Sequence, residues 1–541
     1  MKKNILFLIY MLLFSGLYGQ EKPMRVEIES KSGSDSYRIM PFGKNGVLLY
    51  YLSNERTAAQ NKQWFFTLYD VNFRELWHRV IEISDNMKLK AVDKNDSTLY
   101  LLFAKSYDKK NSKSDFQVLK MDIGSGTSKI VSGVNPDNSY ITDFRVVGNI
   151  AWLSGRTTPK RSQVFAQTLL SITLIPVIAG VNVIKYHASL FALDLETGTI
   201  KNASPVIDGQ AYVSQLRSDS AGKVLYAVVK NHIPKRENYM YLCSYTGNGN
   251  SAGQLRIQSN DVKRKFNSAN IIPLENNKLL VIGTYNNFTK GYSANPASSG
   301  FSESSTGIYI TRLTDGKQDF VKFYNFSTFK NFYNFLNAKS ALRMKKKAIR
   351  QAAKGKEMSI DYSLLVHDII QRGDKSIMIA EAYYPEYHTV SYTTYDAYGR
   401  PQTTSYSVFD GYRYTHAIIV CFDAEGKLLW DNSFEIGNIL TYNLKQRVET
   451  LFDGEDIVMM YSNAGEIASK VIHGNTVVEG KDYTKIETNY SGDQLVSDYN
   501  SDMEFWYGNY FISYGYQKIR NSDAKNKSKR TVFYFNKIAF N

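Results

Sequence analysis

Apolar and polar positions along the chain fall into short blocks rather than long helical stretches. Runs rich in Val, Ile, Leu, Tyr and Phe alternate with turns built from Asp, Asn, Gly and Ser. Two such runs around a short polar turn predict a β-hairpin. Hairpins of this kind open eight units of the chain, which start at Ser36, Met87, Tyr140, Tyr212, Ser268, Leu364, Arg447 and Ser497.

A second hairpin follows in most of these units, and an Asp opens its turn. The carboxylate of such an Asp bonds to the backbone of the turn, and the glycines that follow supply positive φ angles. The pattern is weaker at Tyr239–Ala252 and least clear at Ala468–Gly480. The turn-opening residues are Asp70, Asp122, Asp194, Asp315 and Asp423.

Two hairpins per unit predict a four-stranded sheet, and a ring of such sheets is a β-propeller. We therefore expect an all-β fold, an eight-bladed propeller over residues 20–541, with seven blades as the alternative count. The last unit has one outer run, Arg530–Phe540, and lacks another. We expect the strand Met24–Ser30 to fill that place and close the ring.

Three of the second hairpins share a motif. Ala192–Gly198 reads Ala-x-Asp-x-x-Thr-Gly, and Tyr69–Trp77 and Phe422–Trp430 each end on a Trp. The chain thereby resembles the quinoprotein-like (PQQ-repeat-like) eight-bladed propeller superfamily, at superfamily level. The resemblance implies that these Trp side chains pack between blades. Catalytic members carry an adjacent Cys pair beside the cofactor, which this chain lacks, so no cofactor is expected.

The N-terminal residues 1–19 combine two lysines, an apolar run and small residues. This pattern predicts a secretory signal peptide cleaved near Gly19–Gln20, with an uncleaved anchor as the alternative. We expect export across the inner membrane, to the periplasm or the outer envelope. The cysteines, Cys243 and Cys421, fall on third strands of different blades, so we expect both to stay reduced.

The long insertions all fall on connections that share one face of the predicted propeller, which we call the insertion face. The other face carries only tight turns. Loops on a rigid scaffold often carry function. Residues 164–184 of the first insertion are uncharged, and a buried capping helix, a membrane-dipping segment and a partner groove all fit them. The insertions are residues 156–187, 285–305, 326–362 and 383–414.

The third insertion predicts a basic amphipathic helix. Its apolar residues Phe329, Phe332, Tyr333 and Leu336 fall at helical spacing, and basic residues follow. The chain has a formal net charge of +15, which attracts anionic partners. Such a helix binds an anionic membrane or a partner, or is simply a solvated face. The candidate binding residues are Lys345, Lys346, Lys347 and Arg350.

The fourth insertion is rich in Tyr and predicts a long hairpin that turns at Asp396–Pro401. Exposed Tyr rings stack on sugars or anchor a protein interface, because each offers a large rigid surface with a polar tip. In the alternative, the hairpin packs its own rings together. The candidate binding residues are Tyr387, Tyr392, Tyr395, Tyr398 and Tyr406.

The sequence contains no phosphate-binding loop, zinc-ligand spacing or nucleophile elbow. His388 and His416 flank the Tyr-rich hairpin but lack a third ligand, so no metal site is expected. The acidic stretches 93–96 and 498–502 fit either Ca²⁺ ligands or plain turns.

The favoured function is that of an exported, non-catalytic binding or scaffold module of the bacterial cell envelope. The expected partner is an envelope protein or an anionic lipid or glycan, with peripheral membrane contact and no nucleic acid. The alternative is a glycan-active hydrolase or lyase. Carboxylates within ~5–10 Å of each other at the centre of the ring would favour the enzyme.

Overall fold

The computed structural model describes most of the chain outside its N-terminal region and several connections. The predicted signal peptide and the greater part of the first two insertions lie outside the described residues. Those described are residues 24–30, 36–57, 61–105, 115–135, 139–157, 187–207, 211–219, 221–231, 239–287, 304–358, 360, 362–523 and 529–540.

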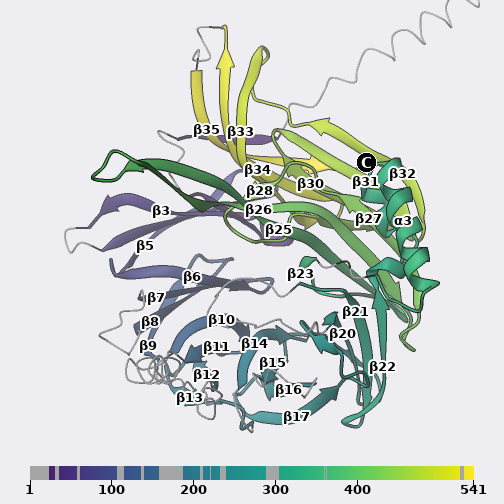
Figure 1. Cartoon of the computed structure of the whole chain (residues 1–541). Coiled ribbons are helices and arrows are strands. Elements are labelled where there is room, and N and C mark those ends of the chain that lie inside the picture. The colour runs from purple at the N-terminus through teal and green to yellow at the C-terminus, as the bar shows by residue number, and fades with distance from the viewer. Residues whose placement is uncertain are drawn as a thin grey trace, which may run out of the picture.

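The described chain is all-β apart from one short α-helix and three 3₁₀ turns, and its strands form eight antiparallel sheets. Figure 1 shows the sheets arranged in a ring, with the purple N-terminal strand beside the yellow C-terminal ones. The prediction of an eight-bladed propeller is confirmed. Seven blades are built around four strands in chain order, as the repeat of hairpins predicts, and the eighth takes its outer strand from the N-terminus.

The first four blades follow this plan closely. Blade 1 holds β2 (Arg38–Pro41), β3 (Val47–Arg56), β4 (Lys62–Tyr69) and β5 (Glu75–Ile83). Blade 2 holds β6 (Met87–Lys94), β7 (Thr98–Lys105), β8 (Asp115–Asp122) and β9 (Ser128–Val134). Blade 3 holds β10 (Ser139–Val147), β11 (Ile150–Thr157), β12 (Ala188–Asp194) and β13 (Ile200–Asn202). Blade 4 holds β14 (Ala211–Ser218), β15 (Val224–Asn231), β16 (Tyr239–Thr246) and β17 (Ser251–Gln258).

The inner strand is divided in the next two blades. Blade 5 holds β18 (Arg264–Phe266), β19 (Asn270–Leu274), β20 (Lys278–Asn287), β21 (Gly307–Thr314) and β22 (Lys317–Asn325). Blade 6 holds β23 (Ser363–Val366), β24 (Ile370–Arg372), β25 (Lys375–Tyr395), β26 (Pro401–Phe422), β27 (Leu428–Glu435) and the short β28 (Leu440–Thr441). Blade 7 holds β29 (Glu449–Asp453), β30 (Asp456–Asn463), β31 (Glu466–His473) and β32 (Thr476–Lys485), so the hairpin least clear in the sequence is present.

Blade 8 closes the ring as predicted. It holds β33 (Asp493–Tyr507), β34 (Tyr510–Asn521) and β35 (Lys529–Ala539), and the N-terminal β1 (Arg25–Glu29) supplies its outer strand. β1 pairs antiparallel with β35, from Arg25 opposite Asn536 to Glu29 opposite Val532. The chain therefore joins its two ends within one sheet.

The hydrophobic core is divided among the junctions between blades. Each of eight buried clusters draws its side chains mainly from two neighbouring sheets. One cluster joins Val47 and Leu49 of blade 1 to Trp506 and Phe533 of blade 8, so the first and last blades pack like any other neighbours. Trp77 donates its indole N–H to the Ile123 carbonyl of blade 2 (2.9 Å), as the resemblance implies for a Trp between blades.

The Asp-opened turns are confirmed with one exception. Asp70 and Asp194 each accept two backbone N–H groups of their own turns on Oδ1. Asp122 and Asp423 likewise cap their turns. Asp315 instead takes a positive φ of 49° and accepts the side-chain amide of Asn277, because the turn there is one residue shorter in front of Gly316.

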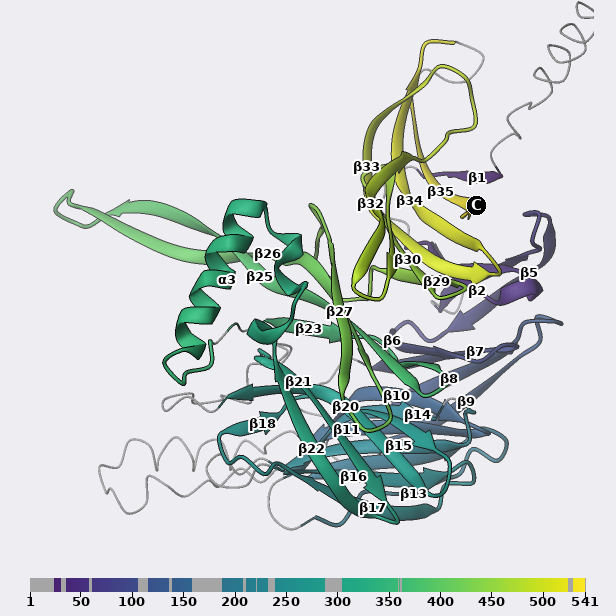
Figure 2. The ribbon, with the colours of Figure 1, turned by 90° about the vertical axis from the view of Figure 1, so that its right-hand side faces the viewer.

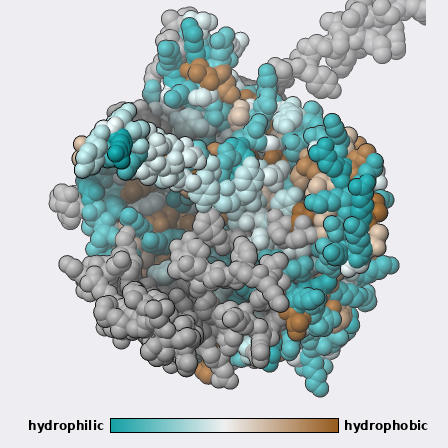
Figure 3. All heavy atoms as spheres, in the orientation of Figure 1, coloured by the Kyte–Doolittle hydropathy of each residue, from teal (hydrophilic) through white to brown (hydrophobic). Residues whose placement is uncertain are grey.

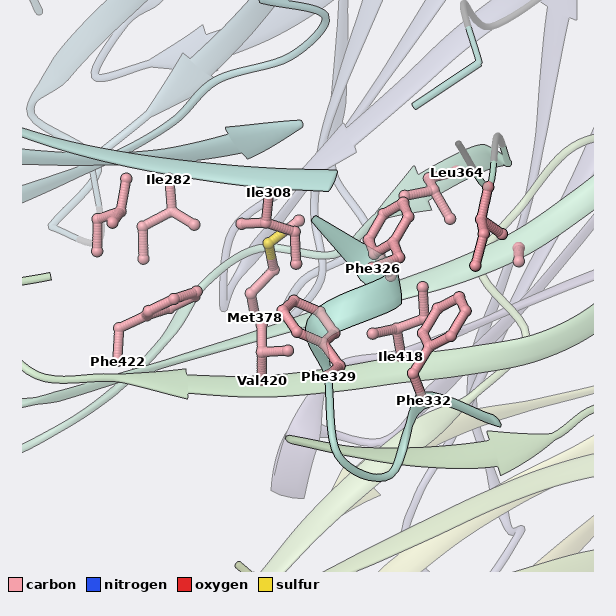
Figure 4. Close-up of a cluster of buried hydrophobic side chains, with 14 of the residues drawn as sticks. Ile282, Ile308, Phe326, Phe329, Phe332, Leu364, Met378, Ile418, Val420 and Phe422 are labelled. Atoms are coloured by element: carbon pink, nitrogen blue, oxygen red, sulfur yellow. The ribbon is translucent and has the colours of Figure 1, made fainter. Parts of the chain in front are cut away.

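The third insertion differs from the predicted single helix. Its aromatic part forms two 3₁₀ turns, η2 (Phe326–Thr328) and η3 (Phe332–Phe335), and only its basic part is helical, as α3 (Ala338–Ala352). Figure 4 shows Phe326, Phe329 and Phe332 packed between the isoleucines of blade 5 and blade 6. The helical-spacing prediction for these rings is wrong, since they fill the gap between two blades, where the chain has to turn.

No helix within the described ranges is long and apolar enough to cross a membrane.

Candidate functional site

The Tyr-rich hairpin is the largest feature of the insertion face. Its strands β25 and β26 are two central strands of blade 6 and continue together beyond the ring to a turn at Asp396. Asp396 Oδ1 accepts the backbone N–H groups of Tyr398 (2.8 Å) and Arg400 (2.9 Å), which fixes the turn. Figure 2 shows the hairpin projecting from the ring, and the predicted long hairpin is confirmed.

The five candidate tyrosines of the hairpin do not form one surface. Residues directly opposite each other on an antiparallel pair share a face. Tyr387 lies opposite Phe409 and Tyr395 opposite Pro401, with no register shift between them. Side chains alternate along a strand, so two tyrosines eight residues apart lie on the same face. Tyr392 and Tyr406 lie on the other face, with ring centroids 6.2 Å apart.

Tyr398 lies in the turn and is the most exposed of the five, at 85%. Tyr383 and Tyr414, at the base of the hairpin, are instead buried in the core between blades 6 and 7. The alternative that the hairpin packs its rings together holds in full at the base. Farther out, rings also pair across the strands, Tyr387 with Phe409 (5.5 Å) and Tyr392 with Tyr406 (6.2 Å), but these tyrosines remain about half exposed.

The four basic candidates lie together on α3, which contains no acidic residue. Ala341, Met344 and Ala348 of the helix pack against the core between blades 5 and 6. Lys346, Lys347 and Arg350 are exposed, and Lys345 is half-buried. Leu342 and Ile349 are also exposed, so the outer side of α3 is basic and partly apolar.

The basic helix and the hairpin tip lie apart. Figure 1 places α3 at the right edge of the ring and the hairpin tip at the left edge. Figure 3 shows the hairpin as a pale band across this face and a teal, hydrophilic region on the α3 side. The structure therefore gives two separate surfaces on one face where the sequence suggested a single basic, Tyr-rich site.

Sequence reasoning missed a charged cluster where blades 7 and 8 meet at the centre of the ring. We call it the central cluster, and it is fixed by hydrogen bonds and ion pairs between the loop before β29 and the strands β33 and β34 of blade 8. Lys445 forms an ion pair with Asp502, which also lies 3.4 Å from Arg447 Nη1. The residues of the central cluster are Lys445, Arg447, Glu449, Asp502, Glu504 and Tyr514.

Tyr514 links the carboxylates of the central cluster. Its hydroxyl lies 3.0 Å from Glu504 Oε1 and 3.4 Å from Asp502 Oδ2, and Lys445 Nζ donates to it at 3.2 Å. The two carboxylates therefore lie within about 10 Å of each other, the upper separation of a glycosidase pair. The side chain of Lys445 is 43% exposed, so water reaches this part of the cluster.

Burial and like charge shift the pKa values of the cluster. Burial, with the neighbouring carboxylate of Glu504, raises the pKa of Glu449 to about 8. Partial burial, with the positive charge of Arg447, lowers the pKa of Lys445 to about 8. Glu449 is consequently protonated over much of the range in which an unperturbed carboxyl group is ionised.

The backbone of this region is tied to blade 6 by a second buried carboxylate. Glu381 Oε1 accepts the backbone N–H groups of Arg447 and Val448, both at 2.8 Å, and lies 2.7 Å from His367 Nε2. Glu381 is fully buried, so these bonds hold the start of β29 in place.

Other charged pairs also join different blades. Arg217 of blade 4 and Asp368 of blade 6 form an ion pair at 2.9 Å, although blade 5 separates their sheets in the chain. Asp93 accepts Arg145 Nη1 (3.1 Å) and the Val146 N–H (2.6 Å). The first acidic stretch is therefore engaged by a neighbouring blade rather than arranged as a calcium loop.

The two histidines that flank the hairpin do not meet. His416 is fully buried, stacks on Phe335 with ring centroids 3.6 Å apart, and has its pKa lowered to about 3 by burial. His388 lies out on the hairpin, 2.5 Å from Asp410. Within the described ranges, no group of three or more His, Cys, Asp or Glu side chains is arranged to hold a metal ion.

Cys243 and Cys421 are both buried free thiols on third strands, as predicted. Burial raises the pKa of each thiol above its ordinary value.

No family model matches the chain, and no curated protein matches it. Among solved structures, the chain is similar to the polysaccharide lyase Uly1, at 9% identity and a TM-score of 0.36, over 83% of this chain and 90% of that one. A prolyl endopeptidase structure has 10% identity and a TM-score of 0.36, over 91% of this chain but only 54% of that one. A puromycin hydrolase has 9% identity and a TM-score of 0.35, over 92% and 60%. These are distant similarities to β-propeller structures, and they assign no family.

Proposed function

We propose that the protein is an exported binding module of the bacterial cell envelope that takes its partner on the insertion face. The observation that carries this proposal is the uncovered hairpin, which holds Tyr rings on both faces and at its tip, beyond the packed ring. Tyr is the residue type that most often anchors such contacts, because it combines a large rigid surface with a polar tip. The proposal includes the quinoprotein-like superfamily, to which the position of Trp77 between blades lends support.

The first experiment captures partners from the native envelope fraction with the tagged full chain. We compare it with a variant in which residues 387–409 are replaced by Asn-Gly, a dipeptide suited to a tight hairpin. Loss of the captured partner in the variant is expected, and equal capture would refute the hairpin as the contact.

Two further variants divide the hairpin by face. Tyr387→Ser with Tyr395→Ser removes the rings of one face, and Tyr392→Ser with Tyr406→Ser removes those of the other. Each pair removes two rings, the first pair from β25 alone and the second from β25 and β26 together. The weaker binder identifies the contacting face. Equal losses would mean that both faces contribute, and full binding by both variants would place the contact at Tyr398.

The basic helix gives the module a second contact with an anionic surface. Replacement of Lys345, Lys346, Lys347 and Arg350 by Gln should weaken binding to anionic liposomes by roughly a thousandfold at low salt, at about 1 kcal/mol for each lost charge. A matched control makes the same charge change on the tight-turn face, at exposed Lys44, Lys223, Lys317 and Lys427. Equal effects of the two sets would mean that only net charge matters.

A second candidate function is favoured by the central cluster: a glycan-active hydrolase or lyase. A carboxyl group that holds its proton near neutral pH can protonate the leaving oxygen of a glycosidic bond, and Glu449 has a pKa of about 8. Glu504 would be the second carboxylate. Screening of neutral and acidic polysaccharides for new reducing ends or unsaturated products tests this candidate.

The matching variants are Glu449→Gln and Glu504→Gln, with Glu455→Gln as control because Glu455 is 72% exposed on the tight-turn face. Activity lost in the first two and kept in the control would support the enzyme. No activity on any polysaccharide leaves the binding module as the proposed function.

A further inference from the structure

The outer edge of β25 is open along the projecting part of the hairpin. β23 pairs with β25 only as far as Tyr383, and no other described strand pairs with that edge beyond it. From Tyr387 to Tyr395 the pairing with β26 runs without a register shift. With respect to the described residues, the edge therefore presents a continuous row of unpaired backbone groups.

The register identifies which residues supply those groups. Tyr395 lies opposite Pro401, which has no N–H, and the backbone N–H of Asp396 donates to the Arg400 carbonyl (3.0 Å). Hydrogen-bonded and non-hydrogen-bonded pairs alternate along an antiparallel ladder. The even-numbered residues from 388 to 394 therefore bond to β26, and the odd-numbered ones point their N–H and C=O groups outward.

These outward residues form a palindrome. In order they are Tyr387, Thr389, Ser391, Thr393 and Tyr395. A second copy of the strand, run antiparallel about Ser391, would set Tyr opposite Tyr, Thr opposite Thr and Ser opposite Ser. All five side chains also lie on one face of the ribbon, so the symmetry applies to the side chains as well as to the backbone.

The same edge lacks the charges that protect the outer edges of the blades. Charged side chains on an edge strand oppose pairing with another chain. Residues 387–395 and 401–409 contain no Asp, Glu, Lys or Arg, and the His388 side chain is engaged by Asp410. Every blade, in contrast, carries a charge on its outermost strand: Glu82, Lys129, Lys201, Arg256, Lys322, Glu435, Glu479 and Glu27.

We propose that two copies of this chain associate through antiparallel pairing of Tyr387–Tyr395, with the twofold axis at Ser391. A two-stranded ribbon is marginal alone, and pairing of two ribbons makes a four-stranded sheet. Ser391 already lies 2.7 Å from Ser405 and Thr393 lies 3.2 Å from Thr403, hydroxyl to hydroxyl, so the dimer would extend one ladder of Ser and Thr across all four strands. This inference deepens the proposed function, since it gives one edge of the hairpin its partner.

Cysteine crosslinking tests the axis directly. Ser391 is the only residue of the strand that would face itself, at a Cα separation of about 5.5 Å, which a disulfide spans. Ser391→Cys should give a covalent dimer on mild oxidation. The matched control is Ser405→Cys, on the same face and directly opposite Ser391 but on the other strand. The native thiols are buried and should not interfere.

Sedimentation of the full chain over a range of concentrations tests the association without crosslinking. We expect a reversible dimer, weakened at least about tenfold by Ser391→Lys, which places two like charges face to face, and unchanged by Ser405→Lys. A protein that stays monomeric at every concentration overturns the inference. Crosslinking through Ser405→Cys instead of Ser391→Cys also overturns it.

The outcome is separable from that of the proposed function. Partner capture with the Ser391→Lys variant measures envelope binding in the absence of the dimer. If Ser391→Lys abolishes the dimer but not partner capture, the proposed binding function stands. If capture is lost only when the hairpin is removed, dimerisation and envelope binding are separate roles of the hairpin.

Discussion

Two sheet edges in this molecule offer the same kind of backbone hydrogen-bonding groups, but only one of them is paired with a further described strand. The outer edge of β35 in blade 8 is covered by β1 from the same chain. No strand in the described part of the chain covers the outer edge of β25 in the hairpin. Each edge offers a row of backbone N–H and C=O groups, so the backbone alone does not explain the difference.

Charge distinguishes the two edges. At the covered edge, Arg530 forms ion pairs with Asp493 (2.6 Å) and Glu27 (3.0 Å), and its side chain is 6% exposed. Arg25 donates to Gln517 (2.7 Å) and Asn536 (3.0 Å). These buried groups accept a single register and a single partner, whereas the uncharged strand of the hairpin matches a copy of itself.

Removal of the covering strand should have the largest effect. Deletion of residues 24–30 exposes the β35 edge and leaves Arg530 with one of its two acidic partners. We expect a much lower melting temperature and concentration-dependent association, measured by scanning calorimetry and size-exclusion chromatography. An unchanged melting curve with monomeric elution would mean that β1 contributes nothing to closure.

Arg530→Met should come next, because it leaves the fully buried carboxylate of Asp493 without its ion-pair partner, while Glu27 keeps its ion pair with Arg25 (2.8 Å). Loss of one partner from a buried ion pair destabilises a fold by about 3–5 kcal/mol. Hydrogen bonds to Asp493 and Glu27 raise the pKa of Arg530, which reflects the same interaction. The control is Arg56→Met, whose ion pair with Asp85 is about half exposed and should change stability by less than about 1 kcal/mol. Similar shifts in the unfolding midpoints of the two variants would contradict a special role for the covered edge.

The central cluster, at the inner edge of the same region, should make stability depend on pH near neutrality, which its counterpart at the outer edge of blade 8 is not expected to do. Glu449 has a pKa of about 8 in the folded chain and 4.5 ordinarily, so the native state binds its proton more tightly between those values. Its contribution to stability is therefore complete below pH 4.5 and lost as the pH rises towards 8. Relative to Glu449→Gln, the wild type should lose up to about 1 kcal/mol per pH unit in that window.

The measurement is the free energy of unfolding of both proteins at intervals from pH 5 to pH 8. Lys445, whose pKa is lowered to about 8, adds the opposite slope above that window, so higher pH is avoided. Parallel pH profiles for the two proteins would show that Glu449 titrates normally.

Shortening the hairpin should have the smallest effect on stability. Replacement of residues 387–409 by Asn-Gly leaves the buried Tyr383 and Tyr414 in place and removes only uncovered ribbon. The melting temperature should stay within the range of an ordinary surface change, about 0.5 kcal/mol. A large loss would indicate that the ribbon packs on the ring and is not a free edge.

The repeat of hairpins made the fold predictable. Hairpins are local in the sequence, and the turn signals at Asp70, Asp122, Asp194 and Asp423 are read from adjacent residues. The single outer run of the last unit also pointed to closure by the N-terminal strand. The helical spacing of Phe329 and Phe332 predicted a helix that is not there. Blades 5 and 6 bury these rings from both sides, so the spacing of the apolar residues reflects contact with the core and not a helix.

The central cluster could not be predicted in the same way. Lys445 and Asp502 come from different blades, as do Arg217 and Asp368, and each is an ordinary polar residue in its own stretch of sequence. Their proximity depends on how far each inner strand reaches towards the axis. The division of the hairpin tyrosines between two faces, in contrast, follows from the alternation of side chains along each strand and from the register set at the turn.

The closure of the ring has a consequence for how the protein is made. Arg25 and Asn536 are 511 residues apart in the chain, yet they bond to each other. At a synthesis rate of about 5–20 residues per second, roughly half a minute to two minutes separate their emergence from the ribosome. Throughout that time the apolar Val26 and Ile28 have no strand to pair with, and every other blade can form before them. The strand of the propeller that is synthesised first is therefore the last to find its partner, and closure of the ring waits for the end of the chain.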